Sequence, residues 1–238
     1  MELKNKKALV TGASGGIGSA IARKFNEKGV ELFLQSKSKE IDLSQYHKDK
    51  AHSFKVDFKN SREIEKIFER MPALDILVNV VGIEYAEEDP FNVESWREIF
   101  EVNLFSAVKC THEALKLMNH GGVVISISSI VGKEGVTYGS ESIAYPASKA
   151  ALNKLTEGIV ALYSPEIRAV TVSPGYTKTP MWNEFDSANI ALHEKEIPTK
   201  KFVQPDEVAN AVVQIAENDS INGCNIIIDG GLGLRIIY

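Results

Sequence analysis

A chain of 238 residues is long enough to bury a large core and suits one α/β domain. Its 44% hydrophobic and 25% charged residues exclude a disordered chain, and a formal net charge of −5 excludes the basic surface of a general nucleic-acid binder. No stretch approaches the ~18 apolar residues of a membrane span, and the charged start of the chain lacks the apolar core of a signal peptide. We therefore expect a cytoplasmic protein with neither a nucleic-acid nor a membrane partner. Cys110 and Cys224 match no metal-ligand or redox spacing, which predicts free thiols and no metal site.

Short apolar runs alternate with helical patterns from one end of the chain to the other. The runs are almost continuously apolar, which is typical of parallel strands covered by helices on both faces. The predicted strands are Ala8–Thr11, Val30–Gln35, Ser53–Val56, Ile76–Val80, Val123–Ser128, Ala169–Ser173 and Asn225–Asp229. This rhythm predicts an α/β fold of three layers, a doubly wound parallel sheet (Rossmann fold) of about seven strands in a single domain over residues 1–238.

The segments between the strands carry helix signals. The first helix should end at Gly29, and Asn60 and Glu63 are spaced like a capping box at the start of the second. Further helices are predicted over Ser95–Met118 (one long helix or two abutting ones), Tyr145–Leu162 and Asp206–Glu217. Only Thr177–Lys201 is irregular, and long irregular segments are usually functional loops, so we predict a substrate loop there.

A glycine-rich turn, Thr11–Gly18, follows the first strand. Gly12 permits the tight turn, Gly16 lets the backbone approach a pyrophosphate, and Gly18 lets the next helix pack against the sheet. The N-terminus of that helix offers unpaired N–H groups and a partial positive charge to phosphates. A tight connection alone is the alternative, but the strand–turn–helix context favours a dinucleotide site.

A Tyr-x-x-x-Lys pair, Tyr145 and Lys149, opens a predicted helix, so the two side chains share one face. The lysine ammonium can stabilise the phenolate and lower the pKa of the tyrosine. Such a tyrosine can protonate a carbonyl oxygen or accept a proton from an alcohol. Ser129, at the carboxyl end of the fifth strand, can hold the same oxygen, and Ser128 competes with it for this role.

The spacing Gly-x-x-x-Gly-x-Gly, together with the Tyr145/Lys149 pair, resembles the short-chain dehydrogenase/reductase family over essentially the whole chain. The resemblance implies a catalytic set of Ser129, Tyr145, Lys149 and Asn103, in which Asn103 supports a water-linked proton relay to the lysine. It also implies a cofactor site. Its residues would be Gly12, Ser14, Gly15, Gly16, Ile17, Gly18, Ser36, Lys37, Asp57, Phe58, Asn79, Gly82, Tyr145, Lys149, Pro174, Gly175, Thr177 and Thr179.

Ser36 and Lys37 follow the second strand, where NAD-specific enzymes place an Asp or Glu on the ribose 2′-hydroxyl. A 2′-phosphate would meet a hydroxyl and an ammonium there, which predicts NADP(H) in preference to NAD(H). Gly15 departs from this pattern, because many NADP-dependent relatives carry a basic residue at its position. The alternative for Lys37 is a solubilising charge on a turn.

Within the family, the length and the Lys-Ala-Leu-Val-Thr-Gly start most resemble bacterial 3-oxoacyl-[acyl-carrier-protein] reductases. The implied activity is NADPH-dependent reduction of a β-ketoacyl thioester in fatty acid biosynthesis, with Tyr145 as proton donor. The alternatives are an enzyme for a small free carbonyl or alcohol (sugar, polyol or quinone) and a non-catalytic NADP-binding sensor or structural protein.

Two kinds of partner surface are implied. Acyl-carrier protein is acidic and needs a basic patch, for which the candidates are Lys109, Lys116, His120, Arg168, Lys200 and Lys201. Family members often form tetramers through the helices around residues 95–118 and 145–162, which implies a homo-oligomer, tetramer or dimer. Residues that would serve this interface, or equally the core, are Trp96, Phe100, Leu104, Phe105 and Val108.

Overall fold

The computed structural model describes residues 1–85, 88–133, 142–180, 182 and 186–234. These residues form a seven-stranded parallel sheet in the order β3-β2-β1-β4-β5-β6-β7. The strands are β1 (Lys7–Val10), β2 (Glu31–Ser36), β3 (Ala51–Lys55), β4 (Leu74–Asn79), β5 (Met118–Ile127), β6 (Ile167–Pro174) and β7 (Asn225–Ile228). The predicted doubly wound sheet is confirmed.

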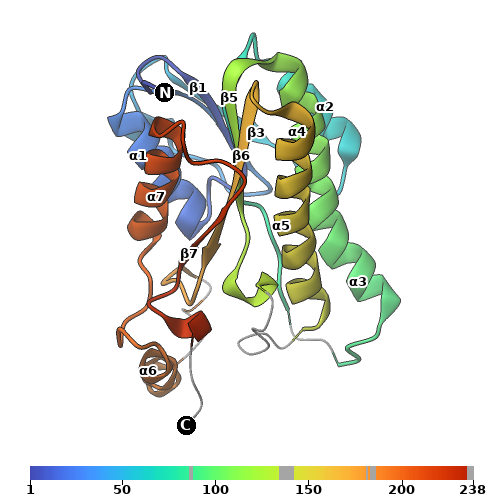
Figure 1. Ribbon diagram of the computed structural model, residues 1–238, viewed down its shortest axis with the longest axis vertical. Coiled ribbons are helices and arrows are strands. Elements are labelled where there is room, and N and C mark those ends of the chain that lie inside the picture. The colour runs from blue at the N-terminus through green and yellow to red at the C-terminus, as the bar shows by residue number, and fades with distance from the viewer. Residues whose placement is uncertain (86–87, 134–141, 181, 183–185, 235–238) are drawn as a thin grey trace.

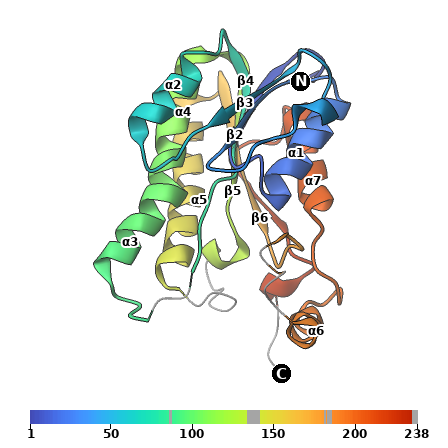
Figure 2. The same ribbon diagram turned by 180° about the vertical axis from the view of Figure 1, so that it is seen from behind.

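Helices cover both faces of the sheet (Figure 1). They are α1 (Gly16–Glu27), α2 (Ser61–Phe68), α3 (Val93–Phe100), α4 (Ser106–Leu117), α5 (Ala144–Tyr163), α6 (Ser187–Glu196) and α7 (Pro205–Glu217). α1 and α7 pack together on one face, and α2, α4 and α5 cover the other, as the view from behind also shows (Figure 2). The short helix α6 lies beyond the carboxyl edge of the sheet, outside both layers.

The core lies on both sides of the sheet because side chains alternate along each strand. Ala8 and Val10 of β1 belong to the cluster under α1 and α7, whereas Leu9 belongs to the cluster under α2 and α4. All three are fully buried. Burying one such Leu or Val side chain stabilises the fold by about 1.5–3 kcal/mol, so the central strands hold the loops at their carboxyl ends in place.

The segment predicted as one long helix or two abutting ones contains a π-helical turn, Glu101–Phe105, between α3 and α4. The prediction also ran one residue too far, because Met118 already belongs to β5. A π turn inserts extra backbone into a helix and is frequent at functional sites. Asn103 lies within this turn and is buried.

Helix α6 corrects the prediction of an irregular segment over Thr177–Lys201. None of its residues is buried, so the sequence contains no apolar stripe from which this helix could be predicted. Its one local signal is Asp186, whose side chain accepts a hydrogen bond from the N–H of Asn189 at 2.8 Å. Gly29 ends α1 as predicted, with φ of 75°.

The capping box predicted for α2 does not form, because Asn60 and Glu63 accept hydrogen bonds from other backbone N–H groups. Asn60 accepts a hydrogen bond from the N–H of Arg62 at 3.2 Å, and Glu63 accepts one from the N–H of Asp57 at 3.3 Å. The carboxylate therefore ties the helix to the end of β3 instead of closing the box.

The predicted interface residues are not core. Trp96, Phe100 and Leu104 are half-buried, and Phe105 and Val108 are exposed. Trp96 stacks on Phe100 with a ring-centroid distance of 5.8 Å. The two exposed side chains, one on the π-helical turn and one on α4, leave an apolar strip in this single chain.

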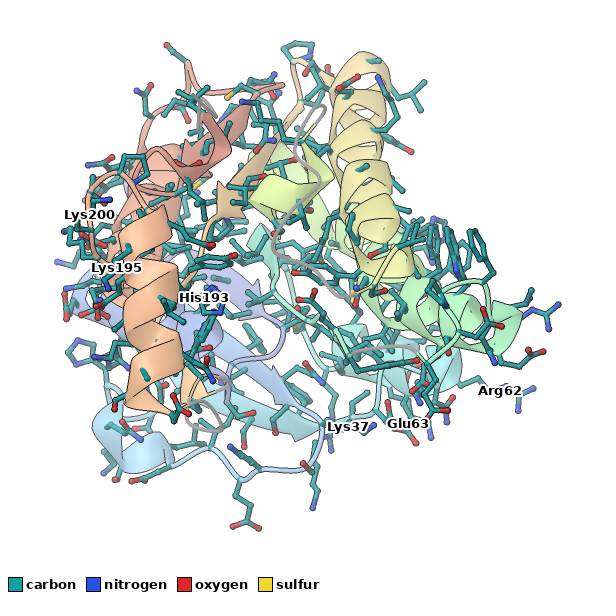
Figure 3. All side chains as sticks on the ribbon, turned by 90° about the horizontal axis from the view of Figure 1, so that it is seen from below. Lys37, Arg62, Glu63, His193, Lys195 and Lys200 are labelled. Carbon is teal, nitrogen blue, oxygen red and sulfur yellow. The ribbon has the colours of Figure 1, made fainter. Side chains whose placement is uncertain are left out.

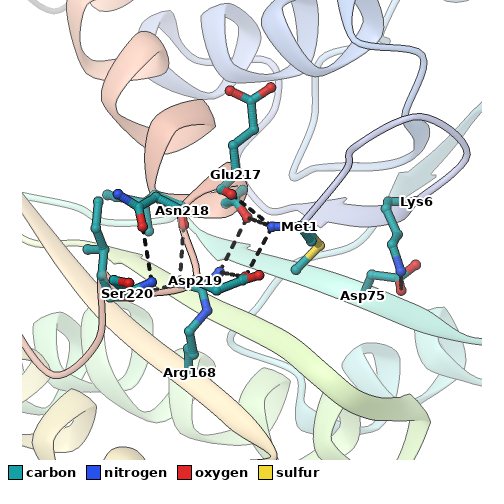
Figure 4. Close-up of polar contacts among 11 residues, drawn as sticks. Met1, Lys6, Asp75, Arg168, Glu217, Asn218, Asp219 and Ser220 are labelled. Atoms are coloured by element: carbon teal, nitrogen blue, oxygen red, sulfur yellow. Dashed lines mark hydrogen bonds and ion pairs between the residues drawn. The ribbon is translucent and has the colours of Figure 1, made fainter.

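A buried arginine closes the carboxyl end of α7 (Figure 4). The Arg168 guanidinium donates to the carbonyls of Ile215 at 3.1 Å, Ala216 at 3.3 Å and Ile221 at 2.7 Å. The Met1 amine donates to the carbonyls of Ala216 and Glu217 beside it. Cations at this end oppose the partial negative charge of the helix terminus. Arg168 is thus structural and cannot belong to a docking patch.

We predict that Arg168→Met lowers the free energy of unfolding by about 2 kcal/mol, because buried carbonyls left without a donor cost about 1–3 kcal/mol. Denaturant titration measures this loss. Arg62→Met, an exposed position on α2, serves as the control and should change stability by less than about 0.5 kcal/mol. Equal midpoints for the two variants would refute the structural role.

Candidate active site

The loops that leave the carboxyl ends of the central strands meet at one edge of the sheet, where α/β folds bind ligands. Figure 3 looks onto this edge, with α6 and its His193 on one side and Lys37 below the end of β2. Predicted site residues lie after six of the strands, with Lys37 after β2 and Asp57 after β3. The glycine turn follows β1, Gly82 follows β4, Ser129 follows β5 and Gly175 follows β6.

The glycine turn is held by a buried glutamine that the sequence analysis missed. The Gln35 side-chain oxygen accepts a hydrogen bond from the N–H of Gly12 at 2.8 Å, and its backbone oxygen accepts one from Ala13 at 2.8 Å. Its amide nitrogen donates to the carbonyl of Val56 at 2.7 Å. Gln35 therefore joins the turn to the ends of β2 and β3. The available signal was a polar residue in an apolar strand.

Two positions of the turn, Gly16 and Gly18, have no space for a side chain. A Cβ at Gly18 would lie 2.3 Å from the backbone oxygen of Gly12, and one at Gly16 would lie 2.8 Å from the Thr179 side chain. Gly15 caps α1 and offers no side chain to its first N–H groups. Those N–H groups point to the carboxyl edge, which fits a pyrophosphate.

Asn79, at the end of β4, is buried, and neither atom of its amide has a partner among the residues described. Buried amides almost always make hydrogen bonds, so this one indicates a contact that a bound molecule would supply. Thr11 holds the following loop, because its hydroxyl accepts from the N–H of Val80 at 2.8 Å and Val81 at 3.2 Å. Asn79 and the glycine turn together fit a dinucleotide.

Lys37 and Asp57 follow the neighbouring strands β2 and β3. The Lys37 ammonium is 3.2 Å from the Asp57 carboxylate, and 63% of the lysine side chain is exposed. A hydrogen bond from the N–H of Lys59, and then Lys37, lower the pKa of Asp57. The Ser36 hydroxyl donates to the Lys39 carbonyl at 2.6 Å, so its proton is already used within the turn.

Packing decides how Phe58 and the loop after β6 could contact a cofactor. The Phe58 side chain is buried in the cluster under α2, so a cofactor contact at this position must come from its backbone. Thr177 donates its hydroxyl to the Gly175 carbonyl at 2.9 Å, and Thr179 packs on Gly16. The loop that follows Pro174, the last residue of β6, therefore lies against the glycine turn.

Tyr145 and Lys149 come together as predicted. The Lys149 ammonium lies 5.6 Å from the centroid of the Tyr145 ring and donates to the carbonyl of Ile127 at 3.0 Å. The Ser129 side chain interacts with Tyr145 and lowers the pKa of its hydroxyl. The rival serine, Ser128, is buried and donates to the backbone of Lys149 at 3.0 Å, so Ser129 is the serine that faces the site.

Asn103 holds the loop after β4 against the lysine. Its side-chain oxygen accepts from the N–H of Ile83 at 2.7 Å, and its amide nitrogen donates to the Ile83 carbonyl and to the Ser148 hydroxyl, each at 3.0 Å. A Cβ at Gly82 would lie 3.1 Å from the Lys149 nitrogen and 3.5 Å from the Asn103 oxygen. A side chain at this position would therefore press on the lysine.

Burial and one carboxylate set the protonation of the pair. Burial lowers the pKa of Lys149 to about 8, and the negative charge of Glu84 opposes that shift. Burial, followed by Glu84, raises the pKa of Tyr145, whereas the hydrogen bond with Ser129 lowers it. Glu84 was missed in the sequence, although it stands two residues after Gly82.

Other predicted features fall outside this edge. The connection before Tyr145 includes residues 134–141, which lie outside the part of the chain that the structure describes. Within that part, no cluster of three His, Cys, Asp or Glu side chains could hold a metal, and no helix is long and apolar enough to cross a membrane. Cys110 is buried and Cys224 exposed, both as free thiols.

Comparison with known proteins identifies the family. Residues 12–233 match the family model described as "Enoyl-(Acyl carrier protein) reductase". The chain is 32% identical to the 3alpha-hydroxysteroid dehydrogenase of Mediterraneibacter gnavus, over 97% of this chain and 98% of that protein. It is 31% identical to the 3-oxoacyl-[acyl-carrier-protein] reductase of Rickettsia felis, over 98% of each.

A solved structure agrees. The ligand-free aldohexose dehydrogenase of Thermoplasma acidophilum superposes with a TM-score of 0.86 at 30% identity, covering 99% of this chain and 97% of that one. The family binds NAD(P). The glycine turn and the Asn79 amide, which has no hydrogen-bond partner among the residues described, fit such a cofactor. The chain belongs to the short-chain dehydrogenase/reductase family and is an oxidoreductase acting on CH–OH or C=O groups.

Proposed function

We propose that this protein is an NADPH-dependent carbonyl reductase in which Tyr145 exchanges the proton with the substrate oxygen. The observation that carries the proposal is the convergence of Ser129, Tyr145 and Lys149 at the carboxyl edge, beside the glycine turn. The nicotinamide would supply the hydride. The non-catalytic alternative loses its basis, because every member of the expected set is present and the relatives are enzymes.

Each residue has a distinct role in this mechanism. Tyr145 gives its proton to the oxygen of the carbonyl as negative charge develops there, and Ser129 donates a hydrogen bond to the same oxygen. The Lys149 ammonium stabilises the phenolate that Tyr145 becomes. Asn103 keeps the loop after β4 against Lys149, and so fixes the ammonium in place.

The substrate proposed from the resemblance is a β-ketoacyl thioester, supported by the relative from Rickettsia felis. Its carrier protein would need a basic surface. Among the candidate residues, Lys109 pairs with Glu65 and Glu113, Lys116 pairs with Glu113, and Lys201 pairs with Glu207. These carboxylates neutralise the positive charge that an acidic carrier protein would bind.

This cancellation favours a second candidate, a small free carbonyl or alcohol, which requires no docking patch. The relatives bear names that include a hydroxysteroid and an aldohexose dehydrogenase, so one scaffold serves both free and carrier-bound substrates. For the cofactor, the exposed Lys37 ammonium at the end of β2 supports NADP(H), since it can meet a 2′-phosphate by leaving Asp57.

We expect the purified protein to oxidise NADPH, followed by absorbance, with an acetoacetyl thioester or with a small carbonyl. Tyr145→Phe should reduce kcat by at least about 100-fold, the usual loss when a general acid is removed. Its NADPH Kd, measured by fluorescence, should stay within about threefold of the parent value, because the ring is retained. Retention of most activity in Tyr145→Phe would contradict the mechanism.

Lys37→Ala should lower the ratio of kcat/KM for NADPH to that for NADH by about tenfold or more, since a charge-assisted contact contributes about 1.5–3 kcal/mol. Lys39→Ala is the matched control, because it removes an exposed ammonium from the same turn and keeps the backbone carbonyl that Ser36 uses. An unchanged ratio in Lys37→Ala would overturn the NADP(H) assignment.

The pH profile should show a limb set by Lys149. As pH rises through about 8, the pKa of Lys149, the ammonium is lost and kcat/KM for reduction should fall. Glu84→Gln should move this limb to lower pH, because the carboxylate raises the pKa of Lys149. Profiles from about pH 6 to about pH 10 test this. A limb that stays in place or moves upward would show that another group titrates.

A further inference from the structure

The chain that leaves β5 carries Ser129 and then forms a single 3₁₀ turn, Ile130–Gly132. The N–H of Gly132 donates to the Ser129 carbonyl at 3.1 Å, and the Ser129 side-chain oxygen accepts from the N–H of Val131 at 3.4 Å. The two apolar residues of the turn are buried in a cluster against which Tyr145 packs. The turn and the serine therefore form one unit next to the reacting tyrosine.

Helix α5 holds the residues that precede Ser129. The Lys149 ammonium donates to the carbonyl of Ile127 at 3.0 Å, and the Ser128 hydroxyl donates to the carbonyl of Lys149, also at 3.0 Å. Both contacts lie on the upstream side of Ser129. The downstream side, which is the 3₁₀ turn, must be held by a different group.

That group is Asn153, one helical turn beyond Lys149. Its amide nitrogen donates to the carbonyl of Gly132 at 3.0 Å. Gly132 lies directly against the helix backbone, because a Cβ there would be 2.7 Å from the carbonyl carbon of Lys149. Tyr145, Lys149 and Asn153 are spaced four residues apart, so they lie along one face of α5. The same stretch of the helix therefore fixes the chain on both sides of Ser129.

Fold stability alone does not explain an asparagine at this position. The side-chain oxygen of Asn153 is buried and has no hydrogen-bond partner among the residues described. A buried polar atom without a partner destabilises a fold. Asparagine is also a poorer helix former than alanine or leucine, and the position lies inside a helix of 20 residues. The feature that does explain the residue is its one hydrogen bond, to Gly132.

We propose that Asn153 is a positioning residue, which sets the orientation of Ser129 through the carbonyl of Gly132. This inference rests on the proposed function, in which Ser129 donates to the carbonyl oxygen as negative charge develops there. In that mechanism Asn153 acts only through the 3₁₀ turn, without contact to the substrate. Loss of its hydrogen bond releases the end of the turn, and a displaced serine stabilises the transition state less.

The test is a double-mutant cycle of Asn153→Ala and Ser129→Ala, with NADPH as reductant and two carbonyl probes, S-acetoacetyl-N-acetylcysteamine and butane-2,3-dione. In the parent background Asn153→Ala should lower kcat by about tenfold or more and leave KM within about threefold, because the weakened interaction forms in the transition state. In the Ser129→Ala background the same substitution should lower kcat by less than about twofold, since residues that act as one unit are not additive.

Lys154→Ala is the matched control, because it changes the next residue of α5, whose exposed side chain pairs with Glu157. Its kcat and KM should equal those of the parent. Asn153→Leu keeps the volume of the side chain and should show the same loss as Asn153→Ala, which separates the lost hydrogen bond from a cavity. Each variant should unfold cooperatively in denaturant and bind NADPH as the parent does.

The outcomes separate the two proposals. An equal loss of kcat in both backgrounds, an unchanged kcat, or a loss that Asn153→Leu does not share overturns the positioning role and leaves the carbonyl reductase standing. Failure of both Asn153 variants to fold has the same meaning, because the residue then serves the fold alone. If Ser129→Ala keeps the parent kcat, the serine and Asn153 lose their roles together, while Tyr145→Phe still tests the reductase. Bound NADPH without turnover of any carbonyl overturns the proposed function and the assignment of Asn153 with it.

Discussion

An ammonium in the interior of a protein loses free energy of hydration and persists only where acceptors or opposite charges replace water. Lys149 meets this condition at the carboxyl edge of the sheet. The carbonyl of Ile127 accepts one of its protons, and Glu84 contributes a compensating charge. Because β5 supplies the carbonyl and the loop after β4 supplies the carboxylate, the sheet itself positions the charge that Tyr145 requires.

The π turn follows from the same requirement. A regular helix through Glu101–Phe105 would direct successive side chains along one continuous spiral, whereas the extra backbone of the turn changes that direction locally. Asn103 then faces inward and holds both polar atoms of Ile83. The loop cannot move away from Lys149 without breaking these bonds. The irregular helix and Gly82 are thus parts of one arrangement that keeps the ammonium in place.

Features with a local pattern were predictable from the sequence, and features that depend on distant partners were not. Apolar runs located all seven strands, and the glycine spacing located the turn before α1. The family resemblance favoured Ser129 over Ser128, but the contact that occupies Ser128, with the backbone of Lys149, appears only in the structure. Arg168 looked like a surface charge for the same reason, since the carbonyls that surround it lie on α7 and beyond.

Glu84 shifts the pKa values of Lys149 and Tyr145 in the same direction. Its charge favours the protonated forms of both Lys149 and Tyr145. A site with a protonated tyrosine and a charged lysine is ready to give a proton, as reduction of a carbonyl requires, whereas oxidation of an alcohol needs the phenolate. The Glu84 carboxylate therefore favours the proton-donating form of the site near neutral pH.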